Sequence, residues 1–356
     1  FFMAMCLSVR WKKDRRLQDL TGQNAFVTRL PDSKNYRFHH MMKECATRKF
    51  RTLPGASQTA YWNRFGDWYG AHRQYLHALD AYRMSANNDA ALAIIEKDAG
   101  NLLSAIAPED LLSRLDACPA EVLMRHPTAL LVLMRRLFTW RQIPKMLQMK
   151  ELLARAIAES PDMTAEERGN LLGECDLIMS FLSYNDITEM SRLHRSASRQ
   201  MTRSAVTIQA GSWTFGSPSV LMMYYRAPGE LQKELHEMNE CMPHYYRITN
   251  GHGLGAELVM AAEASFMQGR LHEAEIGIEC ARTEIAGSGQ ENMALCCDFL
   301  QLRLRLAAGK GRLLDMESRK QSLQARHDVV LLNMLDAIYA YYYANAQADQ
   351  SNLNQI

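Results

Sequence analysis

The chain of 356 residues lacks the short motifs that mark the common classes of enzyme. It contains no G-x-x-x-x-G-K-[ST] phosphate loop, no H-E-x-x-H zinc-binding helix and no G-x-S-x-G nucleophile turn. His39 and His40 are not expected to bind one metal ion together, because neighbouring residues of a predicted strand point to opposite faces. We therefore expect no enzymatic activity, no metal site and no cofactor in this chain. Turnover by the chain alone would instead indicate an all-helical enzyme.

The sequence also lacks an excess of charge and a pattern of paired cysteines. The net charge is +2 at pH 7 with His neutral, so no electrostatic footprint for nucleic acid is present. The basic run Trp11–Arg16 fits a solvated helix face better than a DNA contact, because few aromatic residues or further cations accompany it. The eight cysteines are scattered, which is typical of a reducing compartment. Adjacent Cys296 and Cys297 are predicted to be core residues rather than a redox or metal pair.

A long, uninterrupted apolar segment is absent as well. Val329–Ala346 is mostly apolar, but Asn333 and Asp336 interrupt it, so a buried helix is predicted rather than a membrane span. Phe1–Val9 has no basic segment before it, which argues against a signal peptide, and the missing initiator methionine indicates a piece of a longer protein. We expect a cytoplasmic protein that does not contact membranes.

The most informative segment that is present is Gly255–Ala281, which predicts two amphipathic helices joined by a tight turn at Gly269-Arg270. On the first helix, apolar and small residues at helical spacing form one stripe: Leu258, Ala261, Ala262, Ser265 and Phe266. On the second helix, the inward positions are Ala274, Ile278 and Ala281. Two helices pack closely only where side chains are short, so this pattern predicts a tetratricopeptide-like hairpin.

Similar turns recur about every 40 residues, as in an array of hairpins. The predicted turn positions are Gln142, Asn185, Gly229, Gly269, Gly309 and Asp349. Five residues after each of the first five come Leu147, Met190, Glu234, Ala274 and Leu314, and twelve residues after come Ala154, Ala197, Cys241, Ala281 and Gln321. Because many of these are apolar or small, both positions are predicted to point inward. Stacked hairpins form a curved superhelix with a concave surface.

The first 53 residues differ from the rest of the chain. Asn24–Leu30 is a predicted strand, Pro31–Lys34 a turn, and Tyr36–His40 a second strand that runs into a helix over residues 40–50. This order is typical of the wing of a winged-helix domain. The predicted class is therefore an all-α, tetratricopeptide-like helical-hairpin superhelix preceded by the end of a small winged-helix-like subdomain. The predicted boundaries are 1–53 for that subdomain, 54–125 for a helical connector and 126–356 for the repeats.

Several helix starts are predicted from capping residues. Pro127 is expected in the first turn of a helix, where its missing N–H has no cost. Thr164 and Glu167 have the spacing of a capping box. Ser217 is expected to cap a helix that has Pro218 at its first position.

Two gaps between predicted helices gather aromatic residues, glycines and polar groups, and they are the candidate ligand-binding site. In the first gap, Trp213 and Phe215 could supply stacking faces. In the second, Tyr245 and Tyr246 could do the same, while polar side chains could orient a ligand: Arg247, Asn250, His252 and Glu257. Gaps about one repeat apart are expected on neighbouring repeats along one edge of the array. The alternative is that both are well-packed loops without a ligand.

Several motifs resemble one family. Asn24-Ala-Phe-Val, followed by Tyr36-Arg-Phe-His-His-Met-Met-Lys-Glu-Cys, resembles the wing and final helix of the winged-helix subdomain in LuxR-type regulators of the MalT-like, ATP-dependent STAND group. Further segments resemble the family's tetratricopeptide-like sensor region: Trp62–Tyr69, Tyr75–Leu79, His126–Arg136, Gly211–Ser219 and Cys241–Asn250. The resemblance covers nearly the whole chain.

The resemblance implies a protein of three parts. These are an NTPase module that binds ATP or ADP, a repeat region that receives the inducer, and a C-terminal helix-turn-helix that binds DNA. This chain contains no Walker A motif and no recognisable helix-turn-helix, so nucleotide and DNA binding are expected outside it. The expected function is signal sensing and oligomerisation. The expected partners are a small-molecule or protein inducer on the superhelix and a second copy of the chain.

A second reading remains open, in which the chain is a free-standing helical-repeat scaffold that binds peptide or protein partners. The two readings differ in the surrounding reading frame, because a scaffold would have no Walker A motif upstream and no helix-turn-helix downstream.

Overall fold

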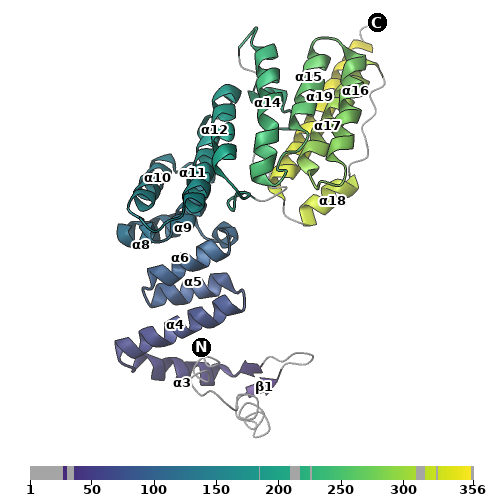
Figure 1. The fold of residues 1–356 in the computed structure, drawn as a ribbon. Helices are drawn as coiled ribbons and strands as arrows, with labels where there is room; N and C mark the ends of the chain where they lie inside the picture. The colour runs from purple at the N-terminus through teal and green to yellow at the C-terminus, as the bar shows by residue number, and fades with distance from the viewer. Residues whose placement is uncertain are drawn as a thin grey trace. The chain divides into compact units, whose positions relative to one another are not determined.

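The computed structural model describes residues 27–29, 36–183, 185–208, 217–224, 227–309, 317–325 and 328–353. These residues are almost entirely helical, as predicted (Figure 1). The chain forms two compact units, residues 1–159 and 160–356. In the described ranges, no helix is both long enough and apolar enough to span a bilayer.

The first described element is an antiparallel ribbon of two short strands. Strand β1 (Val27–Arg29) pairs with β2 (Tyr36–Phe38), and α3 (His40–Arg51) follows directly. The predicted order of strand, strand and helix is therefore confirmed, while the turn over residues 31–34 lies outside the described residues. The placement of His39 and His40 on a strand was wrong. His39 is the N-cap of α3, where its Nδ1 accepts a hydrogen bond from the Met41 N–H at 3.4 Å.

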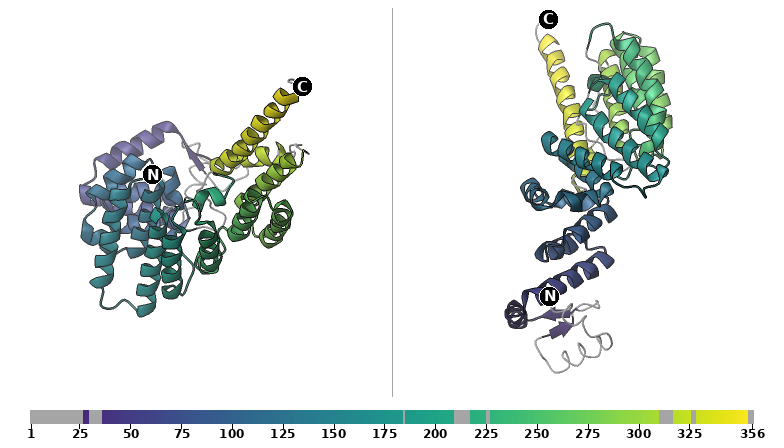
Figure 2. Two further views of the ribbon diagram at one scale, coloured as in Figure 1. Left: turned by 90° about the horizontal axis from the view of Figure 1, so that it is seen from above. Right: turned by 60° about the vertical axis from the view of Figure 1, so that its left-hand side comes forward.

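The remaining helices of the first unit follow one another with short connections. They are α4 (Gly55–Ala71), α5 (Tyr75–Met84), α6 (Asn88–Lys97), the 3₁₀-helix η2 (Asn101–Ala105), α7 (Pro108–Ala117), α8 (Ala120–Met124), α9 (Pro127–Thr139) and α10 (Ile143–Ala158). Pairs that are consecutive in sequence pack as hairpins, namely α4 with α5 and α9 with α10 (Figure 2). Pro127 begins α9, which confirms the predicted helix start.

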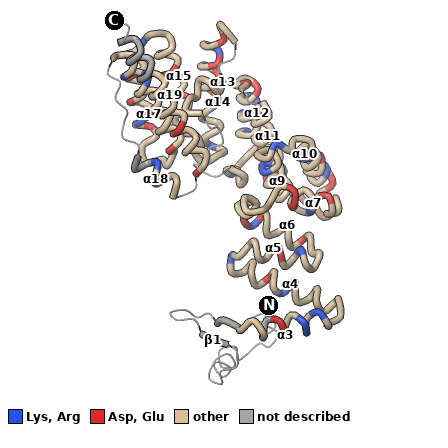
Figure 3. The backbone as a smooth tube through the Cα atoms, turned by 180° about the vertical axis from the view of Figure 1, so that it is seen from behind, with Lys and Arg blue, Asp and Glu red and all other residues tan. Residues whose placement is uncertain are grey.

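The second unit continues the pattern of paired helices. Its helices are α11 (Ala165–Ser180), the 3₁₀-helix η3 (Phe181–Ser183), α12 (Ile187–Gln200), α13 (Leu221–Tyr224), α14 (Leu231–Thr249), α15 (Ala256–Met267), α16 (Leu271–Ile285), α17 (Glu291–Ala307), α18 (Glu317–Ala325) and α19 (Val329–Leu353). The predicted capping box opens α11, with Thr164 Oγ1 accepting from the Glu167 N–H at 3.1 Å. Cys296 and Cys297 are both buried on α17, as predicted. Basic and acidic residues both occur on helices of each unit (Figure 3).

One turn geometry connects the hairpins. The residue after the C-cap adopts a positive φ, and the N–H of the next residue bonds to the carbonyl five residues earlier. This bond closes four of the turns at 2.8–2.9 Å, from Gln74 to Tyr69, from Asn87 to Tyr82, from Gln142 to Leu137 and from Arg270 to Ser265. Positive φ confirms four predicted turn positions, Asn185, Gly229, Gly269 and Gly309.

Two predicted turn positions were wrong. The left-handed residue between α9 and α10 is Arg141 (φ 59°), one residue before the predicted Gln142, because no glycine marks this turn. Asp349 lies within α19, which continues to Leu353 without a turn.

The inward positions follow the turns. Five of the predicted inward residues are buried, namely Met190, Ala197, Cys241, Ala274 and Ala281. In α10 the shifted turn moves the inward face by one residue, so Leu147 (39% exposed) and Ala154 point outward while Met146 and Leu153 are buried. Gln321 is exposed and Leu323 is buried in its place, Glu234 is partly exposed, and Leu314 lies outside the described residues.

The stripe predicted for α15 was only partly right. Ala262 is buried, but Ala261 is exposed, and Val259, Met260 and Glu263 are buried beside it. The close approach of α15 and α16 occurs at Ala262, since a Cβ on Gly277 would lie 2.8 Å from the Ala262 Cβ. Short side chains therefore set the spacing of this hairpin, as predicted.

Candidate functional site

The regular pairing of helices is interrupted between α12 and α14. Residues 201–208 and 217–224, which we call the strap, contain only the four-residue helix α13. The predicted helix start at Pro218 was wrong, because α13 begins at Leu221. The capping oxygen is Ser219 Oγ, which accepts from the Met222 N–H at 3.2 Å, rather than that of Ser217.

The first half of the strap is held by side chains of α11. The Glu174 carboxylate is fully buried, with 0% exposure, and accepts hydrogen bonds from the Thr207 N–H at 2.8 Å and the Arg203 guanidinium at 3.0 Å. Asn170 Oδ1 accepts from the Thr202 N–H at 2.9 Å. These buried side chains supply hydrogen-bond acceptors to the N–H groups of a segment that forms no regular helix.

The second half of the strap is held by α15. The Glu263 carboxylate has 0% exposure, and its Oε2 accepts from the Leu221 N–H at 2.8 Å. Within the described residues its other oxygen has no hydrogen-bond partner. Burial raises the pKa of Glu263 above the usual value for a glutamate. Val220, Leu221 and Tyr224 belong to the hydrophobic core of the second unit, so the strap is an integral part of that core.

The second predicted gap is shorter than expected. Tyr245, Tyr246 and Arg247 lie in the last turns of α14, so their placement outside regular helix was wrong. Helix α14 continues through them because its buried residues keep helical spacing: Met238, Cys241, Met242, Tyr245 and Ile248. Asn250 (φ 55°) ends the helix in the left-handed conformation, and α15 begins at Ala256.

Side chains of this junction bond mainly to one another. The Tyr245 hydroxyl lies 2.7 Å from His252 Nδ1, and both residues are nearly buried, at 6% and 7% exposure. The Tyr246 hydroxyl donates to Glu257 Oε2 and accepts from the Gly255 N–H at 3.0 Å. Burial is the main cause that raises the pKa of Tyr246, and it therefore stays a phenol.

The structure thus brings together five of the predicted site residues around one turn: Tyr245, Tyr246, Asn250, His252 and Glu257. Arg247 is exposed and donates from Nε to Ser198 Oγ of α12 at 3.1 Å. Trp213 and Phe215 lie outside the described residues. The two tyrosines stabilise the turn, and the polar edge that stays accessible consists of Arg247 and Asn250.

A buried polar chain next to this junction was not predicted. His194 Nε2 lies 2.9 Å from Ser180 Oγ, and its Nδ1 lies 3.1 Å from Cys241 Sγ. Burial lowers the pKa of His194 to about 3 and raises that of Cys241 to about 12. A neutral imidazole beside a neutral thiol is not an activated nucleophile, which requires a thiolate. In the described part of the chain, no group of three or more His, Cys, Asp or Glu side chains could hold a metal ion.

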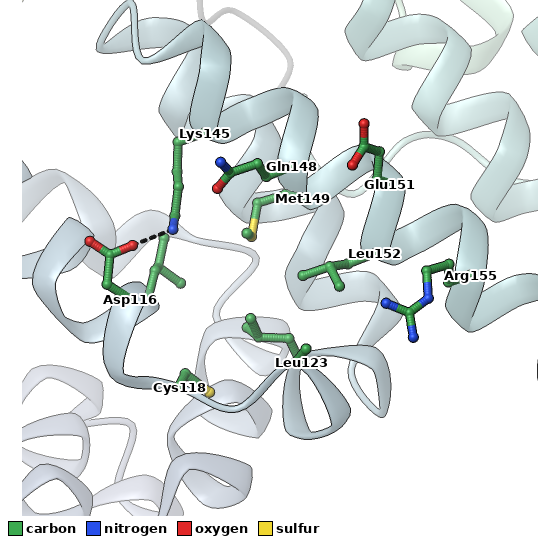
Figure 4. A pocket seen from close by; sticks show the side chains of 11 residues that line it. Asp116, Cys118, Leu123, Lys145, Gln148, Met149, Glu151, Leu152 and Arg155 are labelled. Carbon is green, nitrogen blue, oxygen red and sulfur yellow. Dashed lines mark hydrogen bonds and ion pairs between the residues drawn. The ribbon is translucent and has the colours of Figure 1, made fainter.

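The first unit contains a hollow of about 340 Å³ between α7, α8 and α10, which was also not predicted (Figure 4). Its floor is apolar, with Leu115, Leu123, Met149 and Leu152. Its rim carries both signs of charge, including the ion pair of Asp116 with Lys145 at one end and Arg155 at the other. A mixed rim of this kind does not select one class of ligand.

No protein family, no curated protein and no solved structure matches this chain.

Proposed function

We propose that this chain is the signal-receiving and self-association region of a LuxR-type transcription regulator of the MalT-like STAND group, acting in the cytoplasm. The motif Tyr36–Cys45 supports the proposal, because its residues span β2 and α3 in the order expected for the end of a winged-helix subdomain. ATP or ADP and DNA would bind to modules outside this chain. The chain itself would bind an inducer and would not be catalytic.

The observation that carries this proposal is the strap. In arrays of helical hairpins, segments that depart from the repeat often gather on the binding face. Here the departing segment is tied to two different hairpins through the buried carboxylates of Glu174 and Glu263. A ligand that contacts the strap would therefore act on α11 and α15 together. It would shift the equilibrium between two states of the array by its difference in affinity for them.

The reading frame around this chain provides the first test. We expect a G-x-x-x-x-G-K-[ST] motif upstream and a helix-turn-helix downstream. A frame that encodes neither module would contradict a regulator of this group.

The ligand-binding part is tested by screening small molecules for a shift in the midpoint of thermal unfolding. A molecule that binds at the predicted site should lose affinity in Trp213→Ala and in Arg247→Ala, with helicity unchanged by circular dichroism. Arg199→Ala removes an exposed arginine of α12 outside the predicted site and is the matched control for Arg247→Ala. Unaltered affinity in both site variants would rule out the predicted residues.

A scaffold that binds protein partners is the second candidate, and one observation favours it. Large apolar side chains are exposed on the α15–α16 hairpin, with Met267, Leu271 and Ile276 between 39% and 62% exposed. Clustered exposed apolar residues are typical of surfaces that bind other proteins.

A further inference from the structure

An open groove of about 620 Å³ runs along the outer side of the α15–α16 hairpin. Its apolar part consists of Leu258, Ile276 and Cys280. Its charged part consists of three glutamates of α16: Glu275, Glu279 and Glu284. Ile276, Cys280 and the three glutamates are exposed. The residues of the same helix that are buried in the core are Ala274, Ile278 and Ala281.

The groove exposes an aliphatic side chain on what should be the polar face of an amphipathic helix. Ile276 is 53% exposed, and Cys280 follows it by one helical turn on the same face. Neither residue contributes to packing between α16 and the core, which uses the opposite face. The apolar strip is therefore not explained by the fold of this unit.

The charged residues that line this groove are all glutamates. Arg282 is the cation nearest to the groove in sequence, but it turns inward, to Asp298 at 2.8 Å and Gln301 at 2.9 Å. Arg270 pairs with Glu273 at the start of the helix, at 2.8 Å. Among the described residues, the one ion pair formed by a glutamate of the groove is that of Glu275 with His272, at 3.9 Å.

We propose that this groove binds an amphipathic helix of a partner protein, with lysines or arginines on both sides of an apolar stripe. A helix laid along α16 would place its apolar residues on Ile276 and Cys280 and its cations beside the glutamates. Nucleic acid and anionic lipid are disfavoured, because their phosphates would meet the same glutamates. The proposal goes beyond the regulator function proposed above and does not depend on it. It names a binding site and a class of partner for the scaffold candidate, with which it shares Ile276.

The test uses the whole chain and a fluorescein-labelled 16-residue peptide that repeats leucine at helical spacing with lysine at the other positions. Fluorescence anisotropy is expected to report saturable binding. An analogue of the same length, with glutamate in place of every lysine, is expected to bind at least tenfold more weakly. Tighter binding of the acidic analogue, or no binding of the basic peptide, would overturn the proposal.

Groove variants show where the peptide binds. Ile276→Ser and the double variant Glu279→Lys/Glu284→Lys are each expected to weaken binding at least tenfold. The control Glu121→Lys/Glu240→Lys has the same change in net charge at exposed positions outside the groove, and it should change affinity less than twofold. Equal losses in the control and in the groove variants would indicate attraction by overall charge and would refute the groove.

The thiol of Cys280 gives a second readout in the unaltered protein. Cys280 and Cys45 are both free and exposed, and only Cys280 lines the groove. Saturating peptide should slow alkylation of Cys280 by iodoacetamide at least fivefold, measured by mass spectrometry, while alkylation of Cys45 keeps its rate. Unchanged alkylation of Cys280 in the presence of bound peptide would place the binding site elsewhere.

Discussion

The carboxylate of Glu263 is buried and accepts a hydrogen bond from the Leu221 N–H. It forms no direct ion pair among the described residues. Folding therefore favours its protonated form, and the pKa is raised. Between the usual glutamate pKa of about 4.5 and the raised value, the folded state holds a proton that the unfolded state has lost. The contribution of Glu263 to stability is present at low pH and is lost as the pH rises through this window.

We predict that Glu263→Gln gains stability relative to the natural protein as the pH is raised above about 4.5, because glutamine keeps the acceptor and has no charge to bury. Glu263→Leu removes the acceptor for the Leu221 N–H and should cost about 1–3 kcal/mol at low pH. Urea unfolding at pH 4.5, 6 and 8 measures both. Equal pH dependence in the natural protein and the glutamine variant would contradict the raised pKa.

His194 should act in the opposite direction. Its pKa is about 3 in the folded protein, so between pH 6.5 and 3 the unfolded state binds a proton that the folded state does not. Stability is lost as the pH falls through this window, at up to about 1.4 kcal/mol for each pH unit. The loss of stability in His194→Gln relative to the natural protein should therefore become smaller by about 1.6 kcal/mol between pH 6.5 and pH 5, because the unfolded histidine is only half protonated at pH 6.5. A deficit that stays constant in urea unfolding would show that His194 is not buried in its neutral form.

Local residue patterns were predicted well, and distant pairs were not. Thr164 and Glu167 lie three residues apart, so their capping box depends only on local geometry. His194 and Cys241 come from different helices, and no spacing in the sequence marks them as partners. Nothing in the sequence singles out Glu263, because the strap residue that needs its oxygen, Leu221, lies 42 positions away in the chain.

At the scale of elements, the position of the turn between two paired helices determines which residues of the second helix face the core. Arg141 has φ 59° at a position where glycine avoids the steric conflict of a Cβ. Replacing Arg141 with glycine should therefore stabilise the protein by up to about 1 kcal/mol, after the larger backbone entropy of glycine is subtracted. At Gly269 (φ 77°), alanine should destabilise by about 1 kcal/mol, although a Cβ there has no atom within 4 Å. Thermal unfolding measures both, and changes of the same sign would contradict the assignment.

Packing between paired helices is tested at Gly277. A Cβ there would lie 2.8 Å from the Ala262 Cβ, so Gly277→Ala should destabilise by overpacking, by about 1–3 kcal/mol. The double variant Gly277→Ala/Ala262→Gly should recover most of that loss, because it restores the space between α15 and α16. Losses that simply add in the double variant would show that the two positions are independent.

Elements were predictable where a glycine marks the turn and where side chains repeat at helical spacing. The α9–α10 turn was displaced by one residue because arginine occupies the left-handed position. The end of α14 was missed because Tyr245 and Ile248 bury one face of a helix in a segment that also contains glycines. Tertiary packing determined the position of this turn and the end of α14, and local composition does not predict tertiary packing.

For the whole molecule, the division at residues 159 and 160 gives each unit its own contacts. We predict that residues 1–159 and residues 160–356 each fold when expressed alone, since a compact unit with its own core can do so. Circular dichroism and dispersion of amide proton shifts would report this. An unfolded fragment of either length would show that its core needs the other half. The boundaries predicted at residues 53 and 125 stay predictions.

The strap has a consequence for how the second unit acquires its structure. Stacked repeats fold through contacts between neighbours, which are local in sequence and fast to form. The strap also needs Glu174, Glu263 and the carbonyl of Ile248, which accepts from the Ala205 N–H at 2.7 Å. These hydrogen bonds can form only when helices from three parts of the chain are already in place. Refolding of residues 160–356 should therefore be slower and more nearly all-or-none than the zippering of a regular array.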